Sequence, residues 1–387
     1  MLEAIRCIMR VALLTSYRQK CGVGTYAENL VEALAAAGIE PCVFAPKLGV
    51  GEVESDAPVP SPPRLWAANR AFGLEALGVM RAVRAAGCEV LHLNVNLALF
   101  SSRIVLNLVA LAGLAGMPVV ATLHGRDGGS FGRRFKVWRL YRALRPAHVV
   151  VHNASHAMEL GEFGHPMERV HVIAHGMPAA APPRAANDAR RELGLEPGRR
   201  VLAHFGFLVP DKGVLEVVRA VAALRRQGLG DLFYWICGAV NPRDESSRAY
   251  LATLRAEIER LGIAEHVHLT GQFVSHEQAI AALQAADWIV LNYGTGTAQA
   301  SSGAVSRAFA SGRPVAVSEA SVFDDVRSAA HTLKGPLEPA IAALFANDAL
   351  GRHTAERAAR HLEQAAWPRV AQAYAELYGR VVPSRGR

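Results

Sequence analysis

The stretch DWIVLNYGTGTAQASSGAVSRAFASGRPVAVSEASVFDD, residues 287–325, joins two short apolar runs through a loop rich in glycine, serine and threonine. Residues 288–291 and 315–317 have the length and composition of buried parallel strands, and residues 304–310 are compatible with a helix. Such a loop before a helix offers free backbone amides and the positive end of the helix dipole to an anion. The same composition also suits an ordinary strand-to-helix turn.

The alternation of apolar runs with helix-like segments continues on both sides of this stretch. Predicted strands fall at residues 10–15, 41–45, 90–93, 118–123, 148–151, 170–173, 201–205, 233–237 and 266–269. Alternation at this spacing predicts doubly wound parallel sheets. Residues 177–200, rich in proline and alanine, interrupt it and hold only a short helical piece near residues 186–193.

The chain of 387 residues is long for a single α/β core, so we expect two Rossmann-like domains. The predicted division is residues 1–178, a linker at 179–198, a second domain at 199–360, and a terminal helix at 361–387 that packs back on the first domain. We expect an exposed loop at residues 53–64 and no regular structure at residues 1–8. After residue 325 we expect helices, with Pro368 kinking or restarting the last one.

Composition narrows the class of protein. Hydrophobic residues make up 51% of the chain, but no apolar run has the roughly 18 to 20 residues of a membrane-spanning helix. Five scattered cysteines without metal-ligand spacing favour a reducing cytoplasm and no metal. The net charge of +8 is concentrated in residues 126–145, where seven basic residues face only Asp127. Without a recognised motif, this excess does not indicate nucleic-acid binding.

That basic segment contains FGRRFKVWRLYRALR, residues 131–145. At helical spacing Phe131, Phe135, Trp138 and Tyr141 share one stripe, with cations around and within it. One reading is a core helix whose aromatic stripe packs on the sheet. The other is a helix that rests on an anionic membrane surface, where aromatic and cationic side chains both contribute.

Candidate site residues follow three of the predicted strands. Gly22 and Gly24 precede a helix, His124 directly follows residues 118–123, and Lys212 lies in the loop after residues 201–205. Ligands of open α/β sheets bind at the carboxyl ends of the strands, where these residues are expected. Plainer readings are a tight turn for the glycines, a loop-bonding histidine and a solvated lysine.

Several short motifs occur in the order typical of one family. They are CGVGTY at 21–26, TLHG at 122–125, VIAHGM at 172–177, FGFLVPDKG at 205–213, VHLTGQF at 267–273, AADWIVLNY at 285–293, AFASGRPVAVS at 308–318 and AWPRVAQAYAELY at 366–378. Together they resemble glycosyltransferase family 4, the retaining enzymes that use nucleotide sugars. The resemblance implies the GT-B fold: two Rossmann-like doubly wound domains facing a central cleft, with a C-terminal helix crossing back to the N-terminal domain.

The resemblance also implies residue roles. Lysine and oriented amides would balance the charge that develops on a nucleoside diphosphate leaving group. The implied catalytic residues are His124, Lys212 and Gln299. The implied donor-binding residues are Gly22, Gly24, Gly206, Phe207, Lys212, Gly213, Phe273, Gln299, Ser301, Ser302, Gly303 and Arg307. The family implies no metal, and no cofactor is expected because the nucleotide sugar is a substrate.

Three positions depart from the family pattern. Gln299 and Arg307 stand where the family commonly has two glutamates, and Phe207 stands where an arginine often assists the lysine. A guanidinium only donates hydrogen bonds, so Arg307 cannot receive ribose hydroxyls as a glutamate does. Arg307 could instead bring a cation to the phosphates or contact an acidic sugar, and Glu319 could accept hydroxyl bonds; the sequence does not rank these roles.

We therefore expect a cytoplasmic glycosyltransferase, peripheral on the inner membrane leaflet if residues 131–145 bind anionic lipid. It would move a sugar from a nucleoside diphosphate donor to a glycan or lipid-linked acceptor with retention, in assembly of a cell-surface polysaccharide or glycolipid. The alternative is a non-catalytic GT-B protein that binds a nucleotide sugar or a partner enzyme. A third reading is a sugar epimerase or phosphorylase. The sequence does not specify the sugar, the nucleotide or the acceptor.

Overall fold

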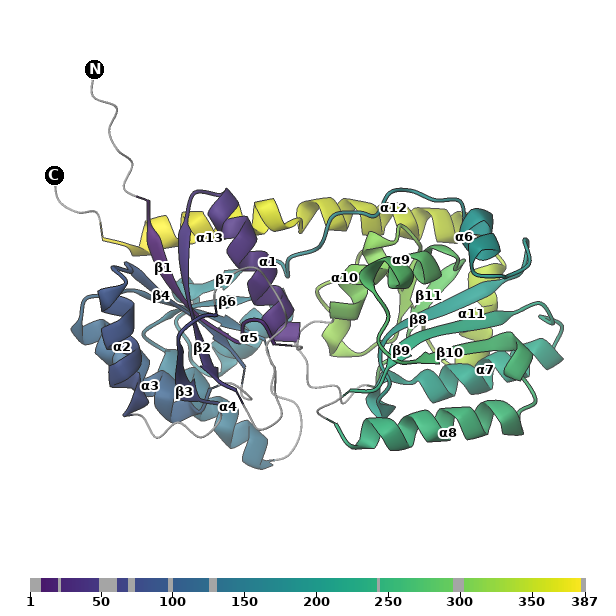
Figure 1. The fold of residues 1–387 in the computed structure, drawn as a ribbon, viewed down its shortest axis with the longest axis horizontal. Coiled ribbons are helices and arrows are strands. Elements are labelled where there is room, and N and C mark those ends of the chain that lie inside the picture. The colour runs from purple at the N-terminus through teal and green to yellow at the C-terminus, as the bar shows by residue number, and fades with distance from the viewer. Residues whose placement is uncertain are drawn as a thin grey trace, which may run out of the picture. The chain divides into compact units, whose positions relative to one another are not determined.

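The computed structural model describes residues 8–19, 22–48, 61–68, 74–96, 100–124, 131–241, 244–294 and 303–383, with the side chains of residues 131–134 and 276 excepted. These residues divide into two compact units. Unit 1 contains the described residues up to Gly176 and those from Ala365 onward, and unit 2 contains those between. Each unit is built on one parallel sheet covered by helices (Figure 1).

Unit 1 has a sheet in the order β3-β2-β1-β4-β5-β6-β7, in which the observed pairings are all parallel. Its elements are β1 (Arg10–Leu14), α1 (Gly22–Ala36), β2 (Glu40–Lys47), β3 (Arg64–Ala67), α2 (Glu75–Ala85), β4 (Val90–Val95), α3 (Ser102–Leu114), β5 (Val119–Leu123), α4 (Phe131–Leu144), β6 (His148–Val151), α5 (Ala154–Glu162), η1 (Met167–Arg169), β7 (Val170–Val172) and α13 (Trp367–Val381).

Helices cover both faces of the unit 1 sheet. Ala12 and Leu14 of β1 belong to the core formed with α2, α3, α4 and α5, whereas Val11 and Leu13 belong to the core formed with α1 and α13. Because successive side chains of a strand point to opposite faces, β1 must be apolar throughout to fill both cores. The unbroken apolar runs in the sequence therefore reflect a sheet buried on both sides.

Helix α13 is the C-terminal element of unit 1 and lies beside α1 (Figure 1). Pro368 occupies its first turn, where a missing backbone N–H leaves no intrahelical bond unmade. The preceding helix ends at Gln364, so the proline restarts the helix, one of the two outcomes that the sequence predicts.

Unit 2 has a sheet in the order β10-β9-β8-β11-β12-β13, again with parallel pairings. Its elements are α6 (Ala186–Glu192), β8 (Val201–Phe207), η2 (Pro210–Lys212), α7 (Val214–Arg226), β9 (Phe233–Ala239), α8 (Ser246–Arg260), η3 (Ala264–His266), β10 (Val267–Gly271), α9 (His276–Gln284), β11 (Trp288–Leu291), α10 (Gly303–Ala310), β12 (Val315–Val317), η4 (Ser321–Phe323), β13 (His331–Thr332), α11 (Leu337–Phe345) and α12 (Asp348–Gln364).

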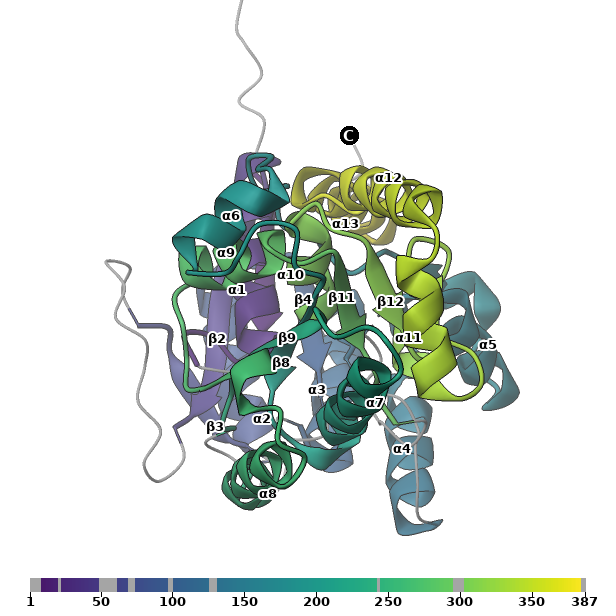
Figure 2. The same cartoon turned by 90° about the vertical axis from the view of Figure 1, so that its right-hand side faces the viewer.

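The unit 2 sheet also lies between two helical layers. Helices α7, α8 and α11 form one core with the sheet, and α9 and α10 lie on the opposite face (Figure 2). Helix α6, from the segment predicted as a linker, contacts α9. Arg190 of α6 is buried and donates to the Ala285 carbonyl at 2.9 Å and to the Asp287 carboxylate at 2.7 Å, which fixes α6 to unit 2.

The prediction of two Rossmann-like sheets is confirmed, but two edge strands were missed. Strand β3 begins at the end of the predicted exposed loop, and its Trp66 is fully buried and stacks on Phe100. Strand β13 contradicts the expectation of helices alone after residue 325. Both strands are too short for a period-two pattern to show in sequence. Residues 1–7 and 53–60, predicted to be irregular, lie outside the described residues.

Candidate functional site

Lys212 ends η2, just after the carboxyl end of β8, and is almost buried, with 7% of its surface exposed. Its ammonium nitrogen lies 3.8 Å from the centroid of the Tyr293 ring. Burial lowers the pKa of Lys212 to about 8, and nearby Asp211 opposes that shift. The reading of Lys212 as a solvated lysine is therefore wrong, because the charged group is held against an aromatic ring after β11.

Gly213 makes this close approach possible. Its φ of 63° lies in the left-handed region, and a Cβ there would stand 1.9 Å from the Asn292 carbonyl oxygen. The Gly294 amide also donates to the Asp211 carbonyl at 2.8 Å. The loop after β8 is thus tied to the loop after β11 at the point where the strand order reverses, the usual ligand-binding place in an open α/β sheet.

His204 is a buried polar residue of β8 that the sequence analysis missed. Its Nδ1 lies 3.4 Å from the Val290 carbonyl, and its Nε2 has no hydrogen-bond partner among the described residues. Burial, assisted by the charge of Lys212, lowers the pKa of His204 to about 4, so the ring is neutral at pH 7. A Cβ at Gly206, where φ is 143°, would lie 3.8 Å from this Nε2.

Arg307 of α10 places its guanidinium carbon 4.9 Å from the centroid of the Phe205 ring. Burial lowers the pKa of Arg307, and no carboxylate in the described part of the chain pairs with it. Phe207, two residues along β8, contacts Phe273 edge to face at 5.8 Å, and Phe273 is 61% exposed. Gly303 begins α10 and is exposed, and the predicted site residues Gln299, Ser301 and Ser302 lie outside the described residues.

In unit 1, His124 directly follows β5, as expected, and its amide donates to the Val95 carbonyl at 3.0 Å. The imidazole packs against the Tyr26 ring with centroids 4.5 Å apart. Burial is the main cause that keeps the pKa of His124 well below its usual value, and the neighbouring His152 and His175 lower this pKa further. A neutral imidazole in this position can exchange hydrogen bonds with a sugar hydroxyl without the cost of a buried charge.

His152 and His175 extend this group into a histidine cluster that the sequence analysis missed. They follow β6 and β7, and their ring centroids lie 5.2 and 6.5 Å from that of His124. Burial lowers the pKa of His152 to about 3 and that of His175 to about 4. The available signal was a histidine within three residues after each of three successive apolar runs. Among the described residues no three potential ligands are grouped to hold a metal ion.

A buried chain of hydroxyl and imidazole groups connects α13 to this cluster. The Tyr374 hydroxyl lies 2.9 Å from the Tyr26 hydroxyl and 2.7 Å from Thr122 Oγ1. His92 bonds Thr122 at 2.8 Å through Nε2 and the Tyr378 hydroxyl at 2.6 Å through Nδ1. Tyr26 therefore meets His124 on one side and α13 on the other, so α13 helps to position the cluster.

Gly22 and Gly24 do not form a loop before a helix, because both lie in the first turn of α1. Gly24 is buried, and a Cβ on Gly22 would meet no atom within 4 Å. A steric requirement for glycine is thus absent at position 22.

Helix α4 buries only Tyr141 of the aromatic stripe, among the residues whose side chains are described. Val137, Leu140, Tyr141 and Leu144 face the core, and the helix packs on α3. Phe135 and Trp138 are 52% and 40% exposed and stack on each other with centroids 5.7 Å apart. The core-helix reading is therefore wrong for these two rings. No helix among the described residues is long and apolar enough to cross a membrane.

Comparisons with known proteins agree with this architecture. The Glycosyltransferase Family 4 model matches residues 21–180, and the Glycosyl transferases group 1 model matches residues 186–335. The chain is similar in fold to sucrose-phosphate synthase from Thermosynechococcus elongatus, with a TM-score of 0.75, 17% identity, and coverage of 96% of this chain and 99% of that one.

Two further solved structures share the fold. HepE from Anabaena, in complex with UDP-glucose, gives a TM-score of 0.68 and 17% identity, covering 96% of this chain and all of that one. Trehalose 6-phosphate synthase from Burkholderia multivorans gives 0.67 and 12%, covering 98% and 100%. No curated protein matches the sequence. Because the two family models together cover most of the chain, the chain belongs to the GT-B glycosyltransferases, with a family 4 domain followed by a group 1 domain.

Proposed function

We propose that the protein transfers a sugar, with retention of anomeric configuration, from a nucleoside diphosphate sugar to a glycan or lipid-linked acceptor. The observation that carries this proposal is Lys212, a cation held almost buried at the strand-order reversal of unit 2. A nucleoside diphosphate gains negative charge as the glycosidic bond breaks, and a fixed cation stabilises that charge best where water is excluded. The solved complex of HepE with UDP-glucose supports a donor of this class.

The remaining donor contacts are proposed from the same edge of the unit 2 sheet. Gly206 leaves room near the Tyr293 hydroxyl, and the backbone amides of the first turn of α10, from Gly303, can donate to phosphate oxygens. Phe207 and Phe273 offer an aromatic surface, and Arg307 offers a second cation. The roles assigned to Gln299, Ser301 and Ser302, and to Gly22 and Gly24, stay predictions, as does that of His124 at the transferring sugar.

We further propose that the protein works in the cytoplasm at the inner membrane leaflet, in assembly of a cell-surface polysaccharide or glycolipid. Support comes from residues 131–145, where two exposed aromatic rings lie among cations. The guanidinium carbons of Arg139 and Arg142 lie 6.0 and 5.6 Å from the Phe135 and Trp138 ring centroids. The expected result is sedimentation with anionic but not with neutral vesicles, and release when Arg133, Arg134 and Lys136 are replaced by Ser.

The experiment that tests the function begins with a thermal-shift screen of nucleotide sugars on the purified protein. The donor that stabilises the protein is then mixed with candidate acceptors, and the anomeric configuration of the product is determined by NMR. Retention of the donor's configuration is the expected result. An inverted product would overturn retention alone, whereas no binding of any nucleoside diphosphate sugar would overturn the proposal.

A second candidate function is binding of a nucleotide sugar without transfer. Arg307 favours it, because this half-buried cation has no carboxylate partner among the described residues and cannot accept hydrogen bonds from ribose hydroxyls. Tight donor binding with neither transfer nor hydrolysis, across acceptors and at enzyme concentrations that would reveal a single turnover, would favour this candidate over the enzyme.

A further inference from the structure

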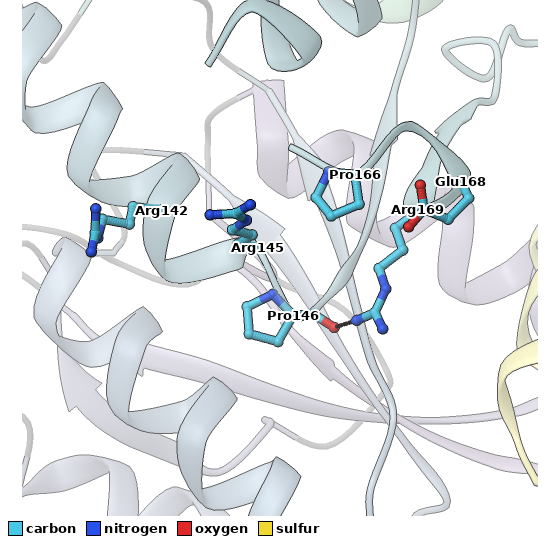
Figure 3. A pocket seen from close by; sticks show the side chains of 6 residues that line it. All are labelled: Arg142, Arg145, Pro146, Pro166, Glu168 and Arg169. Atoms are coloured by element: carbon cyan, nitrogen blue, oxygen red, sulfur yellow. Dashed lines mark hydrogen bonds between the residues drawn. The ribbon is translucent and has the colours of Figure 1, made fainter. Parts of the chain in front are cut away.

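A cavity of 510 Å³ lies in unit 1 at the end of the sheet opposite to the histidine cluster. It is found where α4 leads into β6 and where η1 leads into β7, so it faces the amino ends of these strands. Figure 3 shows the side chains around it, which are Arg142, Arg145, Pro146, Pro166, Glu168 and Arg169. Within unit 1, this position separates the cavity from Gly22, Gly24 and His124, which lie toward the opposite end of the sheet.

The cavity carries an excess of positive charge. Three arginines line it with a single carboxylate, Glu168, and no ion pair joins Glu168 to any of them. Arg169 Nη1 donates to the Pro146 carbonyl, which leaves its other N–H groups available. The side chain of Arg145 has no hydrogen bond or ion pair with any described residue. The sequence supplies no acidic residue between Asp127 and Glu159 to offset this charge.

The positive charge around the cavity also affects the pKa of two neighbouring histidines. Burial lowers the pKa of His148 and of His165, and in each case Arg169 lowers it further. Arg145 adds to the effect at His165. The end of α4 opposes an anion with roughly half an elementary negative charge. Three guanidinium groups outweigh that partial charge, so the cavity favours an anionic group.

The same side of α4 also presents apolar surface. The guanidinium carbon of Arg142 lies 5.6 Å from the Trp138 ring centroid, and Trp138 stacks on Phe135. Met167, which begins η1, is 50% exposed. Arginine forks beside exposed aromatic and thioether groups match a surface where phosphate and hydrocarbon meet, as they do at the face of a lipid bilayer.

We propose that this cavity binds the phosphate group of an anionic membrane lipid, with Arg145 and the free N–H groups of Arg169 as donors and Phe135 and Trp138 entering the interface beside it. The inference rests on the membrane location proposed above and adds a defined site to it. The cations of α4 could also attract a negatively charged membrane without any defined site. The experiment below distinguishes that general attraction from binding of a phosphate group in the cavity.

The test compares Arg145→Gln with Arg139→Gln, two variants that each lose one charge from the same exposed region. Arg139 lies outside the cavity and serves as the matched control. Phosphatidylcholine vesicles are given equal negative charge with either phosphatidic acid or oleic acid, and the bound fraction is measured by sedimentation. Wild type should bind the phosphatidic acid vesicles about tenfold more tightly than the oleic acid vesicles.

Arg145→Gln should abolish that preference, and Arg139→Gln should weaken binding to both vesicle types by the same factor, about fivefold. An equal response of the two variants, or no preference in wild type, overturns the site. Inorganic phosphate titrated without vesicles tests the other source of this anion. Phosphate binding that depends on Arg145, together with no vesicle preference, would overturn the lipid as the ligand.

Two controls keep the interpretation clear. Thermal unfolding of Arg145→Gln should match wild type, because its side chain has no partner to lose. Sugar transfer from a soluble donor to a soluble acceptor, measured without vesicles, tests the proposed enzyme separately. Transfer activity without phosphate preference refutes the cavity proposal alone, whereas vesicle preference without transfer refutes the proposed enzyme and leaves the lipid site standing.

Discussion

At the scale of single residues, Lys212 is the group whose ionisation most directly bears on the proposed donor site. Burial lowers its pKa to about 8, so the ammonium form predominates below that pH and the neutral amine above it. Only the charged form attracts a diphosphate. Affinity for a nucleoside diphosphate should therefore fall as pH rises from 7 to 9, after the phosphates themselves are ionised.

Replacement of Lys212 by alanine should weaken nucleoside diphosphate binding by about tenfold to a hundredfold, the range for a lost charge-assisted hydrogen bond. Calorimetry at pH 7 and pH 9 measures this, and the variant should show no further loss between the two pH values. Lys334→Ala, on an exposed lysine of unit 2, is the matched control. A variant that keeps wild-type affinity and its pH dependence removes Lys212 from the site.

Residues of this site differ in how far the sequence predicts them. His124 and Lys212 stand at or just after a strand end, where position alone indicates a ligand site. His152, His175 and His204 were missed, because a histidine beside or within an apolar strand is as compatible with a core as with a site. Burial decides which of them are neutral, and burial depends on packing between segments distant in sequence.

At the scale of elements, α13 is bound into unit 1 through two kinds of contact. Its Val370, Tyr374, Leu377 and Tyr378 are buried against α1 and the sheet, each contributing roughly 1.5–3 kcal/mol for a fully buried large apolar side chain. The Tyr374 hydroxyl adds bonds to Tyr26 and Thr122. The helix therefore stabilises the sheet and holds the groups next to His124.

Tyr374→Phe should lower the free energy of unfolding of unit 1 by about 1–3 kcal/mol, because it leaves buried hydroxyl partners with one bond fewer. Urea unfolding followed by near-UV circular dichroism measures the change. Tyr17→Phe is the control, since Tyr17 is half-buried and no bond of its hydroxyl is found among the described residues. An equal effect of both substitutions would show that the chain of hydroxyl groups does not stabilise unit 1.

Elements also differ in how well the sequence predicts them. The long apolar strands at the centre of each sheet were predicted because a strand buried on both faces is a continuous apolar run. For α4 the sequence left open whether the aromatic stripe is buried: Tyr141 packs in the core with the aliphatic side chains of the helix, whereas Phe135 and Trp138 stay exposed. The spacing of apolar residues predicts that this segment is a helix, but it does not predict which of the two apolar stripes is buried.

At the scale of the whole molecule, alternation predicts two sheets but not which distant segments complete each one. Unit 1 draws on both the beginning and the end of the chain, with unit 2 between them. Local patterns do not encode that pairing. It was expected because a long final helix after a complete domain needs a surface to pack on, and the resemblance of residues 366–378 to a terminal helix that crosses back supports the same pairing; α13 contacts α1.

The place of α13 has a consequence for synthesis on the ribosome. The strands of unit 1 emerge first. The apolar surface formed by Tyr26, Leu30 and Leu34 stays exposed until α13, which ends at Val381, has been synthesised and packs on it. By the time that helix leaves the exit tunnel, the described elements of unit 2 have left it before α13 and can fold. The portion of the protein made earliest is thus completed last, and a nascent chain stalled before residue 367 displays an apolar surface that chaperones bind.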